Sequence, residues 1–381
     1  MPVLSCGGMR YQQSWEDIAP GDVEKKNQEN LERTLYAALD RGITHIETAR
    51  GYGSSEMQLG WVLPQIDRDR FLLQTKIGPK DSAAEFLKVF ETGMDYLKVE
   101  YVDFLSIHGI NTPELLEQSL KPNGSLSAIR QLQKEGRVRF CGFSTHAGPE
   151  VVIPACECGE FDYVNLHWYF VYDQLHRSMI DAAAKMDMGV LIISPNDKGG
   201  MLYNPTEKMA KLCDPLTPMQ WNDLYCLARP EVHTLSIGAS KPSEFDEHVA
   251  AVSTYLDDRM IGQIEHRIIQ SLEADLGEEW MRRWPEGLPH YTQTPNEINV
   301  REILRLWTFA KGLDLVDFAK MRYNLLGNAE HWFPGQQAVT VEALDWACLS
   351  SSPFAARIPG ILKEAHAWFF EEKETTRASE S

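Results

Sequence analysis

The sequence predicts an α/β fold, a (β/α)8 barrel of the TIM type followed by a mainly helical C-terminal domain. Within residues 3–255, short apolar runs alternate with helical patterns in eight successive pairs, as expected for parallel strands joined by helices. Ionisable side chains stand at or just beyond the ends of several runs. No G-x-G-x-x-G follows the first run, which favours the barrel over a doubly wound sheet. We assign residues 1–257 to the barrel and 258–381 to the second domain.

The strands and helices follow from local patterns. In the first helix, for example, Leu31, Leu35, Ala38 and Leu39 share one face. Strands are expected at 3–5, 43–46, 71–75, 102–107, 138–143, 162–166, 189–193 and 232–237. Helices are expected at 28–41, 54–63, 83–98, 124–135, 148–157, 174–187, 218–228 and 242–255. In the C-terminal domain, helices are expected at 263–276, 300–311, 315–326 and 360–371, ahead of a polar tail from Glu372.

Composition limits the possible functions. The chain has 381 residues with 43% hydrophobic and 24% charged residues, which suits one large or two ordinary globular domains. Its formal net charge of −18 argues against nucleic-acid or anionic-membrane partners. A signal peptide and a membrane-length apolar run are absent from the sequence, so we expect a cytoplasmic protein. Seven scattered cysteines fit a reducing compartment, and the lone pair Cys156 and Cys158 predicts no metal site.

Four ionisable side chains mark a candidate active site. Glu47 ends the second strand, Lys76 follows the third and His108 follows the fourth, while Tyr52 stands in a glycine-flanked loop just after Glu47. Lysine or histidine rarely ends a buried strand by chance, because either side chain needs a partner or water there. A barrel brings strand ends to one face, where its chemistry takes place. Taken alone, the tyrosine motif is equally compatible with an ordinary helix N-terminus.

These motifs resemble those of the aldo-keto reductases over roughly residues 1–255. The matching stretches are I-E-T-A-R-G-Y-G-S-S-E, Q-T-K and V-D-F-L-S-I-H-G. The resemblance implies an NADP(H)-dependent oxidoreductase that reduces an aldehyde or ketone, with a small-molecule carbonyl compound as its partner. It implies Tyr52 as general acid, with Lys76 lowering its pKa, and His108 bound to the substrate oxygen. Glu47, where the family usually has Asp, would pair with Lys76. Its extra methylene is compatible with a slow enzyme or with one retuned for a particular substrate.

The resemblance also implies where a nicotinamide cofactor would lie. Ser144 and Asn165 would hold the carboxamide, although Thr145 replaces the asparagine that the family has beside that serine. Further contacts are expected from Met9 and Arg10 after the first strand and from Ser194 and Pro195 after the seventh. Lys198 is either a phosphate contact or an exposed loop lysine.

The adenosine end falls after the eighth strand, in I-G-A-S-K-P-S-E-F-D-E-H. Gly238 and Ser240 lead into a helix start, a geometry that binds phosphate, and Ser240 with Lys241 would contact a 2′-phosphate. Glu247 and His248 match the family's Glu-Asn pair at the adenine. Glu244 stands at the family's phosphate-binding arginine and would repel phosphate. Lys241 nevertheless favours NADP(H), with NAD(H) not excluded.

Aromatic residues after the sixth strand are the expected substrate walls. Trp168 and Tyr169 are the main candidates, with Phe170 beside them. Trp332 and Phe333 are equally compatible with ordinary core packing. Asn196 and Asp197 could also line the mouth, and a monomer or small homo-oligomer is expected.

The C-terminal region resembles a ferredoxin-like extension found in one branch of the family. The matching stretches are I-N-V-R-E-I-L-R-L-W, A-K-M-R-Y-N-L-L-G-N-A and H-W-F-P-G. Much of that branch binds iron–sulfur clusters through C-x2-C-x2-C-x3-C-P runs. Here the region contains only Cys348. Since a cluster needs about four thiolates, we expect none. The family also places a β-hairpin before its first barrel strand; this chain begins almost at that strand, so the hairpin is absent or lies upstream.

Two other functions fit parts of the sequence. A metal-dependent hydrolase would use His108, His146 and His167 near successive strand ends, but V-L-S-C-G-G on the first strand lacks the usual histidine pair. A sensor or interaction protein that binds NADP(H) with little turnover would fit the change from Asp to Glu at position 47.

Overall fold

The computed structural model describes residues 1–253 and 258–372, which form two compact units. The first contains the described residues of Met1–Trp168, His176–Pro195 and Asp223–Thr254. The second contains those of Tyr169–Leu175, Asn196–Asn222 and Tyr255–Ser381. It thus takes in two segments that we assigned to the barrel, and the proposed boundary between residues 257 and 258 stays a prediction.

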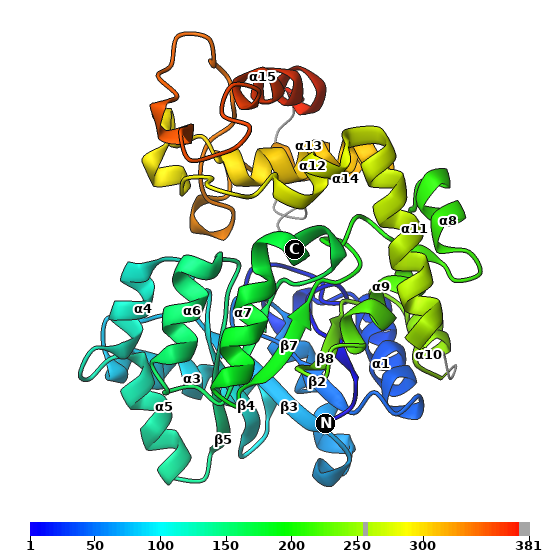
Figure 1. Cartoon of the computed structure of the whole chain (residues 1–381). Helices are drawn as coiled ribbons and strands as arrows, with labels where there is room; N and C mark the ends of the chain where they lie inside the picture. The colour runs from blue at the N-terminus through cyan, green and yellow to red at the C-terminus, as the bar shows by residue number, and fades with distance from the viewer. Residues whose placement is uncertain (254–257, 373–381) are drawn as a thin grey trace. The chain divides into compact units, whose positions relative to one another are not determined.

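The first unit is a closed barrel of eight parallel strands in sequence order, and this confirms the predicted fold class (Figure 1). The strands are β1 (Leu4–Gly7), β2 (His45–Glu47), β3 (Leu72–Ile77), β4 (Val102–His108), β5 (Val138–Ser144), β6 (Tyr163–Leu166), β7 (Gly189–Ile193) and β8 (Val232–Ile237). Each lies within two residues of its predicted bounds. Because all strands are parallel, their carboxyl ends meet at one end of the barrel.

Helices follow the strands along the chain. They are α1 (Lys25–Asp40), α2 (Ser55–Leu59), α3 (Ala83–Leu97), α4 (Pro113–Leu120), α5 (Ser125–Lys134), α6 (Pro149–Glu157), α7 (Asp173–Lys185), α9 (Pro218–Leu227) and α10 (Asp246–Ser253). The sequence analysis missed α4, although Thr112 caps it by accepting a hydrogen bond from Leu115 N. The predicted helix 242–255 begins as a 3₁₀ turn, and its last two residues lie outside the described ranges. Within the described residues, the 3₁₀ turns are Pro20–Asp22, Leu63–Gln65, Arg68–Arg70, Phe170–Tyr172, Pro242–Phe245, Tyr291–Gln293, Pro295–Glu297, Glu330–Trp332 and Ala347–Leu349.

Side chains fill the barrel interior. The Tyr163 ring covers Gly142, where an added Cβ would lie 2.4 Å from the ring. The Tyr163 hydroxyl lies 2.9 Å from Ser106 Oγ. On the neighbouring strands β1 and β2, Ser5 Oγ lies 2.7 Å from His45 Nδ1. The barrel interior is therefore a packed core rather than a channel.

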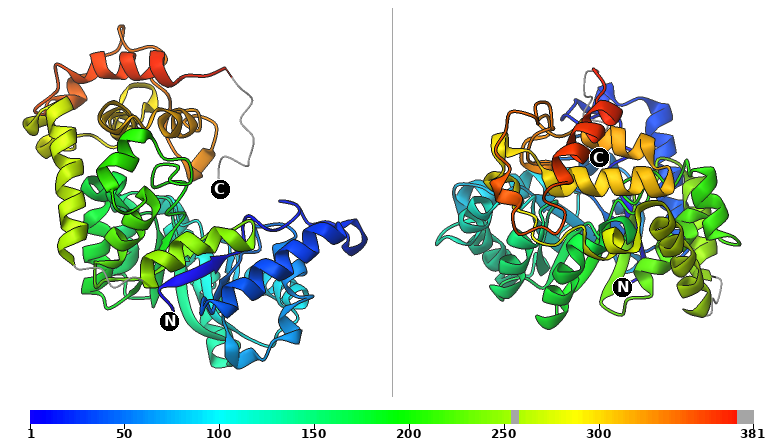
Figure 2. Two further views of the ribbon diagram at one scale, coloured as in Figure 1. Left: turned by 90° about the vertical axis from the view of Figure 1, so that its right-hand side faces the viewer. Right: turned by 45° about the horizontal axis from the view of Figure 1, so that its top comes forward.

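The second unit is built around a buried helix, α13 (Val300–Leu313). It packs against α11 (Asp258–Leu276), α14 (Val316–Tyr323) and α15 (Ile358–Phe369). The two views of Figure 2 show α15, in red, beside α13 and α14, in orange. The remaining helices are α8 (Glu207–Cys213), which packs against α11, and α12 (Glu278–Arg283). The predicted C-terminal helices agree with α11, α13, α14 and α15, whereas α8 and α12 were not predicted.

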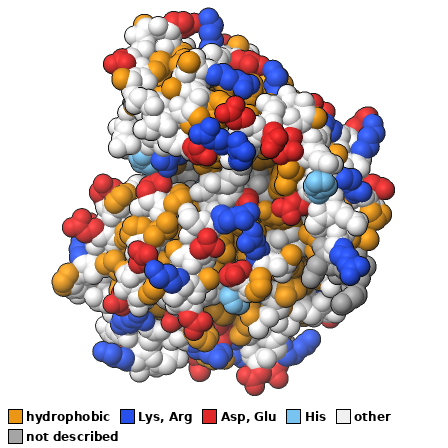
Figure 3. All heavy atoms as spheres, in the orientation of Figure 1, with side chains coloured by type: hydrophobic (Ala, Val, Ile, Leu, Met, Phe, Trp, Pro, Cys, Tyr) orange, Lys and Arg blue, Asp and Glu red, His pale blue; other side chains and the backbone are white. Residues whose placement is uncertain are grey.

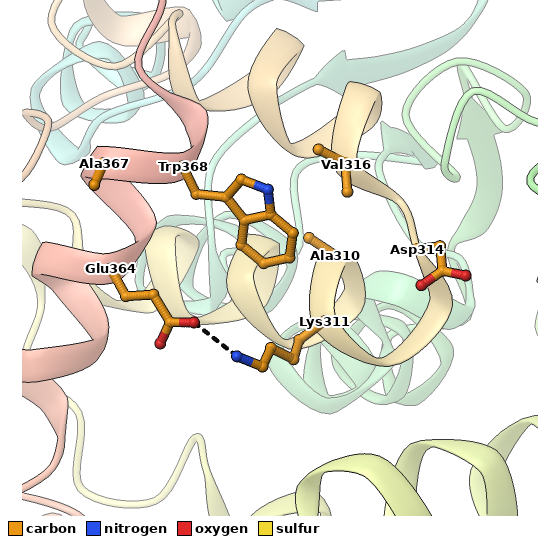
Figure 4. Close-up of a pocket in the computed structure, with 7 residues that line it drawn as sticks. All are labelled: Ala310, Lys311, Asp314, Val316, Glu364, Ala367 and Trp368. Atoms are coloured by element: carbon orange, nitrogen blue, oxygen red, sulfur yellow. Dashed lines mark hydrogen bonds and ion pairs between the residues drawn. The ribbon is translucent and has the colours of Figure 1, made fainter.

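Aromatic packing and ion pairs hold these helices together. Trp280 on α12 lies edge-on to Trp307 on α13, with ring centroids 5.4 Å apart. A groove of about 570 Å³ lies between α13, α14 and α15, and Trp368 forms part of its wall (Figure 4). Beside it, Lys311 Nζ lies 2.7 Å from Glu364 Oε1, which ties α15 to α13.

The surface is charged but mixed. On the face in Figure 3, acidic and basic side chains are interspersed. Among the described residues, no helix has both the length and the apolar character needed to cross a bilayer.

Candidate active site

Three of the predicted side chains form a chain of contacts at the carboxyl ends of β2 and β3. Lys76 Nζ donates to the Tyr52 hydroxyl at 3.2 Å and to the Thr48 carbonyl oxygen at 3.1 Å. It also forms an ion pair with Glu47 Oε1. Lys76 is 1% and Glu47 3% exposed, so the pair is shielded from water. A buried ammonium needs such a carboxylate partner, as the sequence analysis expected.

His108 completes the group from the end of β4. Its ring lies edge-on to the Tyr52 ring, with centroids 5.7 Å apart at 83°. Gly51 lies beside this ring, and a Cβ added there would be in ordinary van der Waals contact, 3.7 Å from His108 Nδ1. The structure therefore brings together all four residues that the motifs predicted. Their catalytic roles stay predictions.

Glu47 has a second partner that the sequence analysis did not find. Ser236 on β8 donates a hydrogen bond from Oγ to Glu47 Oε2. Strand β1 lies between them and places Gly7 opposite Glu47. A Cβ on Gly7 would lie 3.0 Å from Ser236 Oγ. The glutamate, one methylene longer than aspartate, thus reaches past a glycine to a serine on the far side of β1.

The loop that carries Tyr52 is fixed from the β1–α1 connection. Gly53 has φ +52°, and an added Cβ would lie 2.2 Å from the Ser14 carbonyl oxygen, so only glycine fits. Ser54 N donates to that same oxygen at 3.0 Å. Trp15 packs edge-on against Tyr52, with centroids 6.2 Å apart.

A buried carboxylate braces the loop from below. Glu56, fully buried, accepts hydrogen bonds from Arg50 Nη1 at 2.7 Å and from Thr75 Oγ1 at 2.5 Å. Burial raises the pKa of Glu56, although Arg50 and Thr75 act against the rise. Arg50 N also donates to the Lys76 carbonyl oxygen at 2.9 Å. These contacts explain structurally why the Y-G-S-S-E motif ends in glutamate.

The pKa shifts of Glu47, Lys76 and Tyr52 differ in part from expectation. Burial would lower the pKa of Lys76, but the Glu47 carboxylate and its hydrogen bonds outweigh it, so the pKa is raised. Burial likewise acts to raise the pKa of Glu47, yet Lys76 and Ser236 bring it below its ordinary value. For Tyr52 burial prevails, and its pKa is raised even though Lys76 acts to lower it. Our expectation of a lowered tyrosine pKa was therefore wrong for the net shift.

Two predicted nicotinamide contacts lie on neighbouring strands. Ser144 ends β5, where its Oγ accepts from Gly109 N at 3.1 Å. Asn165 on β6 is fully buried, and its Oδ1 accepts from Gln74 Nε2 at 2.7 Å. Its Nδ2 is buried with no hydrogen-bond partner. Since buried donors are almost always paired, this amide is available to a carbonyl acceptor.

Asn111, in the loop after β4, is a further polar residue at this position that the sequence analysis missed. Its Oδ1 accepts a hydrogen bond from His146 N at 2.7 Å and from Thr145 Oγ1 at 3.3 Å. Thr145 also donates to the Ile110 carbonyl oxygen at 2.7 Å. The loop where Thr145 replaces the family's asparagine is therefore held by an asparagine from the neighbouring loop.

The predicted adenosine end gathers after β8. Arg10 Nη1 donates to the Gly238 carbonyl oxygen at 3.0 Å and lies 3.7 Å from Glu244 Oε2. Glu244 in turn accepts from both the backbone N–H and the hydroxyl of Ser240. Lys241, the next residue, is exposed.

Other predicted cofactor contacts have different surroundings. His248 is fully buried, and its Nδ1 lies 2.5 Å from Asp223 Oδ2. Burial would lower the pKa of His248, but Asp223 outweighs it and raises the pKa. Ser194 follows β7 with φ +51°. Lys198 is only 1% exposed and belongs to the second unit, so it is not an exposed loop lysine. For Met9, Pro195, Lys198, Glu247 and His248, as for the other residues assigned to the cofactor, contact with it stays a prediction.

The predicted substrate walls are packed within the protein. Trp168 is fully buried and stacks on Tyr225, with centroids 5.4 Å apart. Tyr169, also fully buried, lies edge-on to Tyr172. Phe333 is buried beneath the guanidinium of Arg322, 4.0 Å from the ring centre, which is a core-packing role. A substrate role for Trp168 and Tyr169 stays a prediction.

The three histidines that suggested a metal site contact other side chains. His108 packs against Tyr52. The His146 and His167 rings lie edge-on, 4.4 Å apart. Across residues 1–253 and 258–372, no three His, Cys, Asp or Glu side chains are grouped as ligands of one ion.

Comparison with known proteins assigns the chain to a family. The model of the aldo/keto reductase family matches residues 3–269, more than half of the chain, and the chain therefore belongs to that family. It is 22% identical over 298 residues to probable aldo-keto reductase 1 of Glycine max, covering 67% of this chain and 82% of the relative. It is 21% identical over 277 residues to the NADH-specific methylglyoxal reductase of Escherichia coli (strain K12), covering 59% and 83%.

Solved structures share the barrel. The aldo-keto reductase from Klebsiella pneumoniae in complex with NADPH superimposes with a TM-score of 0.56 at 18% identity, covering 70% of this chain and 90% of that one. At this identity the likeness establishes the fold. The resemblance of residues 258–381 to a ferredoxin-like extension stays a prediction.

Proposed function

We propose that the chain reduces an aldehyde or ketone by hydride transfer from a nicotinamide dinucleotide, with Tyr52 as the proton donor. The observation that carries this proposal is the contact between the Tyr52 hydroxyl and Lys76 Nζ at 3.2 Å, with Lys76 paired to Glu47. His108 stands against the same tyrosine ring. Family membership supports the reaction class.

The residues at the strand ends fit the nicotinamide half of such a cofactor. The unpartnered Nδ2 of Asn165 can donate to a carboxamide oxygen, and Ser144 lies on the neighbouring strand. The relative from Klebsiella pneumoniae was solved with NADPH, and the relative from Escherichia coli is NADH-specific, which supports the cofactor class without choosing between its two forms. A bound dinucleotide would supply the hydride that adds to the carbonyl carbon.

The protein's own task is to place a proton on the carbonyl oxygen. Tyr52 keeps its proton at neutral pH, because burial raises the pKa of its phenol. Lys76 stabilises the tyrosinate left after proton transfer, and Glu47 holds Lys76 charged and in place. His108 would hydrogen-bond the substrate oxygen and fix its angle toward Tyr52. Positioned acids of this kind contribute about 10²- to 10⁴-fold to rate.

The test combines cofactor binding with turnover on the full chain. NADH and NADPH are titrated while tryptophan fluorescence is followed, and aromatic aldehydes and quinones are then added while nicotinamide absorbance is recorded. Binding followed by oxidation of the cofactor supports the reductase.

Binding with no oxidation by any carbonyl compound would contradict it and favour the sensor interpretation. In that case Glu47→Asp, which restores the family's usual acid, is the informative variant: recovered turnover would identify Glu47 as the cause. Failure to bind either dinucleotide would contradict both functions and leave the family membership as a statement of fold.

A further inference from the structure

The anion-binding position after β8 is already occupied by a carboxylate of the chain itself. Ser240 N donates to Glu244 Oε2 at 2.8 Å, and Ser240 Oγ donates to Glu244 Oε1 at 2.8 Å. Both donors of Ser240, which the sequence analysis assigned together with Lys241 to a 2′-phosphate, are therefore used by one side chain. Ser240 lies one residue before Lys241, which is the N-cap of the 3₁₀ turn Pro242–Phe245, and its backbone N–H is bound to the Glu244 carboxylate.

Neighbouring side chains hold this arrangement in place. Asn30 Nδ2 on α1 donates to the Ser240 carbonyl oxygen at 2.6 Å. Arg10 Nη1 donates to the Gly238 carbonyl oxygen at 3.0 Å and lies 3.7 Å from Glu244 Oε2. The cation nearest to this carboxylate is thus partly neutralised by it. Lys241, the residue after Ser240, is exposed, so salt screens its attraction for an anion.

NADPH differs from NADH only by the phosphate at the 2′ position of its ribose. A phosphate monoester carries a charge of about −1.5 to −2 at neutral pH and would meet the negative charge of Glu244. It would also have to displace Glu244 from two hydrogen bonds. The ribose 2′-hydroxyl of NADH instead can donate a hydrogen bond to a carboxylate, as it does in other dinucleotide-binding folds.

We propose that Glu244 is a specificity-determining residue that makes this chain select NADH over NADPH. The inference rests on the proposed function, since it assumes that a nicotinamide dinucleotide binds at the strand ends. It departs from the NADP(H) preference that Lys241 suggested in the sequence.

The experiment measures the ratio of two dissociation constants and requires no substrate. The full chain, with its ten tryptophans, is titrated with NADH and with NADPH by fluorescence at low and at high salt. We expect NADH to bind at least about tenfold more tightly than NADPH, which corresponds to about 1.4 kcal/mol. Because the repulsion is between partly exposed charges, the ratio should narrow at high salt.

Variants assign the effect to one side chain. Glu244→Gln keeps the shape and removes the charge, so NADPH binding should improve about tenfold with little change for NADH. Glu244→Arg should reverse the preference. Asp246→Asn is the matched control, because it removes one negative charge two residues away, where Asp246 pairs with Arg41 rather than with Ser240. It should leave the ratio unchanged.

The outcomes separate the two claims. Wild-type protein that binds NADPH as tightly as NADH, or more tightly, would overturn the selectivity while leaving the reductase intact. An unchanged ratio in Glu244→Gln, with a thermal midpoint near that of wild type, would overturn the assignment to Glu244. If neither cofactor binds, the proposed function and this inference are both wrong.

Discussion

Replacing Ser236 by alanine tests whether the glutamate at position 47 depends on its second partner. In the structure, Glu47 uses one oxygen for Lys76 and the other for Ser236, and the carboxylate is 3% exposed. Ser236→Ala leaves the second oxygen buried without a donor. A hydrogen bond to a charged group contributes about 1.5–3 kcal/mol, so we expect a loss of that size in the free energy of unfolding.

A double-mutant cycle isolates this contact. Glu47→Gln removes the counter-ion of the buried Lys76 and should cost about 3–5 kcal/mol by itself. In that background Ser236 bonds at most a neutral amide, worth about 0.5–1.5 kcal/mol. We therefore expect a coupling of about 1–2 kcal/mol between positions 47 and 236, larger than the scatter of about 0.3–0.5 kcal/mol for independent sites.

The assay is urea unfolding followed by circular dichroism and tryptophan fluorescence, with coincident transitions as the condition for a two-state analysis. Thr234→Val is the matched control, since Thr234 lies on the same strand as Ser236 and its hydrogen bond is to a neutral partner, Ser5 on β1. It should cost about 1 kcal/mol and add to Glu47→Gln without coupling. Additivity of Ser236→Ala with Glu47→Gln would refute the reasoning.

Three further outcomes follow from the same geometry. Burial lowers the pKa of His45 from 6.5 to about 4. As pH falls, this histidine therefore takes up its proton in the unfolded chain at a higher pH than in the folded protein. The free energy of unfolding should fall by up to about 3 kcal/mol between pH 6.5 and pH 4. His45→Gln should flatten that pH dependence, and an unchanged slope would argue against it. Gly53→Ala, whose Cβ would meet the Ser14 carbonyl oxygen, should lower the thermal midpoint and reduce kcat more than cofactor affinity; a wild-type kcat would speak against the fixed loop. Lys76→Met should raise the pKa of Tyr52 further, because Lys76 acts to lower it. Alcohol oxidation needs the tyrosinate, so its rate should begin to rise at a higher pH. An unchanged pH–rate profile would argue against an effect of Lys76 on Tyr52.

The barrel and the four site residues could be predicted because both depend on local patterns. Each strand is a short apolar run, and parallel strands place their ends together by topology. Glu47, Lys76 and His108 stand at the ends of those runs and Tyr52 in the loop after Glu47, so strand order brings them to one face.

The second partner of Glu47 could not be predicted in the same way. Ser236 and Glu47 are 189 positions apart, and their contact depends on the closure of β8 onto β1 and on the register that puts Gly7 between them. Asn111 could not be predicted for the same reason. It lies in the loop after β4 and accepts a hydrogen bond from His146 N in the loop after β5.

Burial was the other quantity that the sequence could not supply. The charge pattern indicates correctly that Lys76 acts to lower the pKa of Tyr52, but the desolvation that outweighs it depends on tertiary packing. Lys198 lies in a loop sequence where a lysine would usually be exposed, and it is nevertheless only 1% exposed. The helices α8 and α12 are short, with too few turns to give a clear periodic pattern.

The most direct test of the central claim is the rate of carbonyl reduction by Tyr52→Phe, measured with the cofactor that wild-type protein binds more tightly. Phenylalanine keeps the ring against His108 and removes only the hydroxyl bonded to Lys76. We predict that cofactor affinity changes by less than about twofold while kcat falls about 10²- to 10⁴-fold. A Tyr52→Phe variant that binds the cofactor normally and retains the wild-type kcat would show that the proton comes from another group.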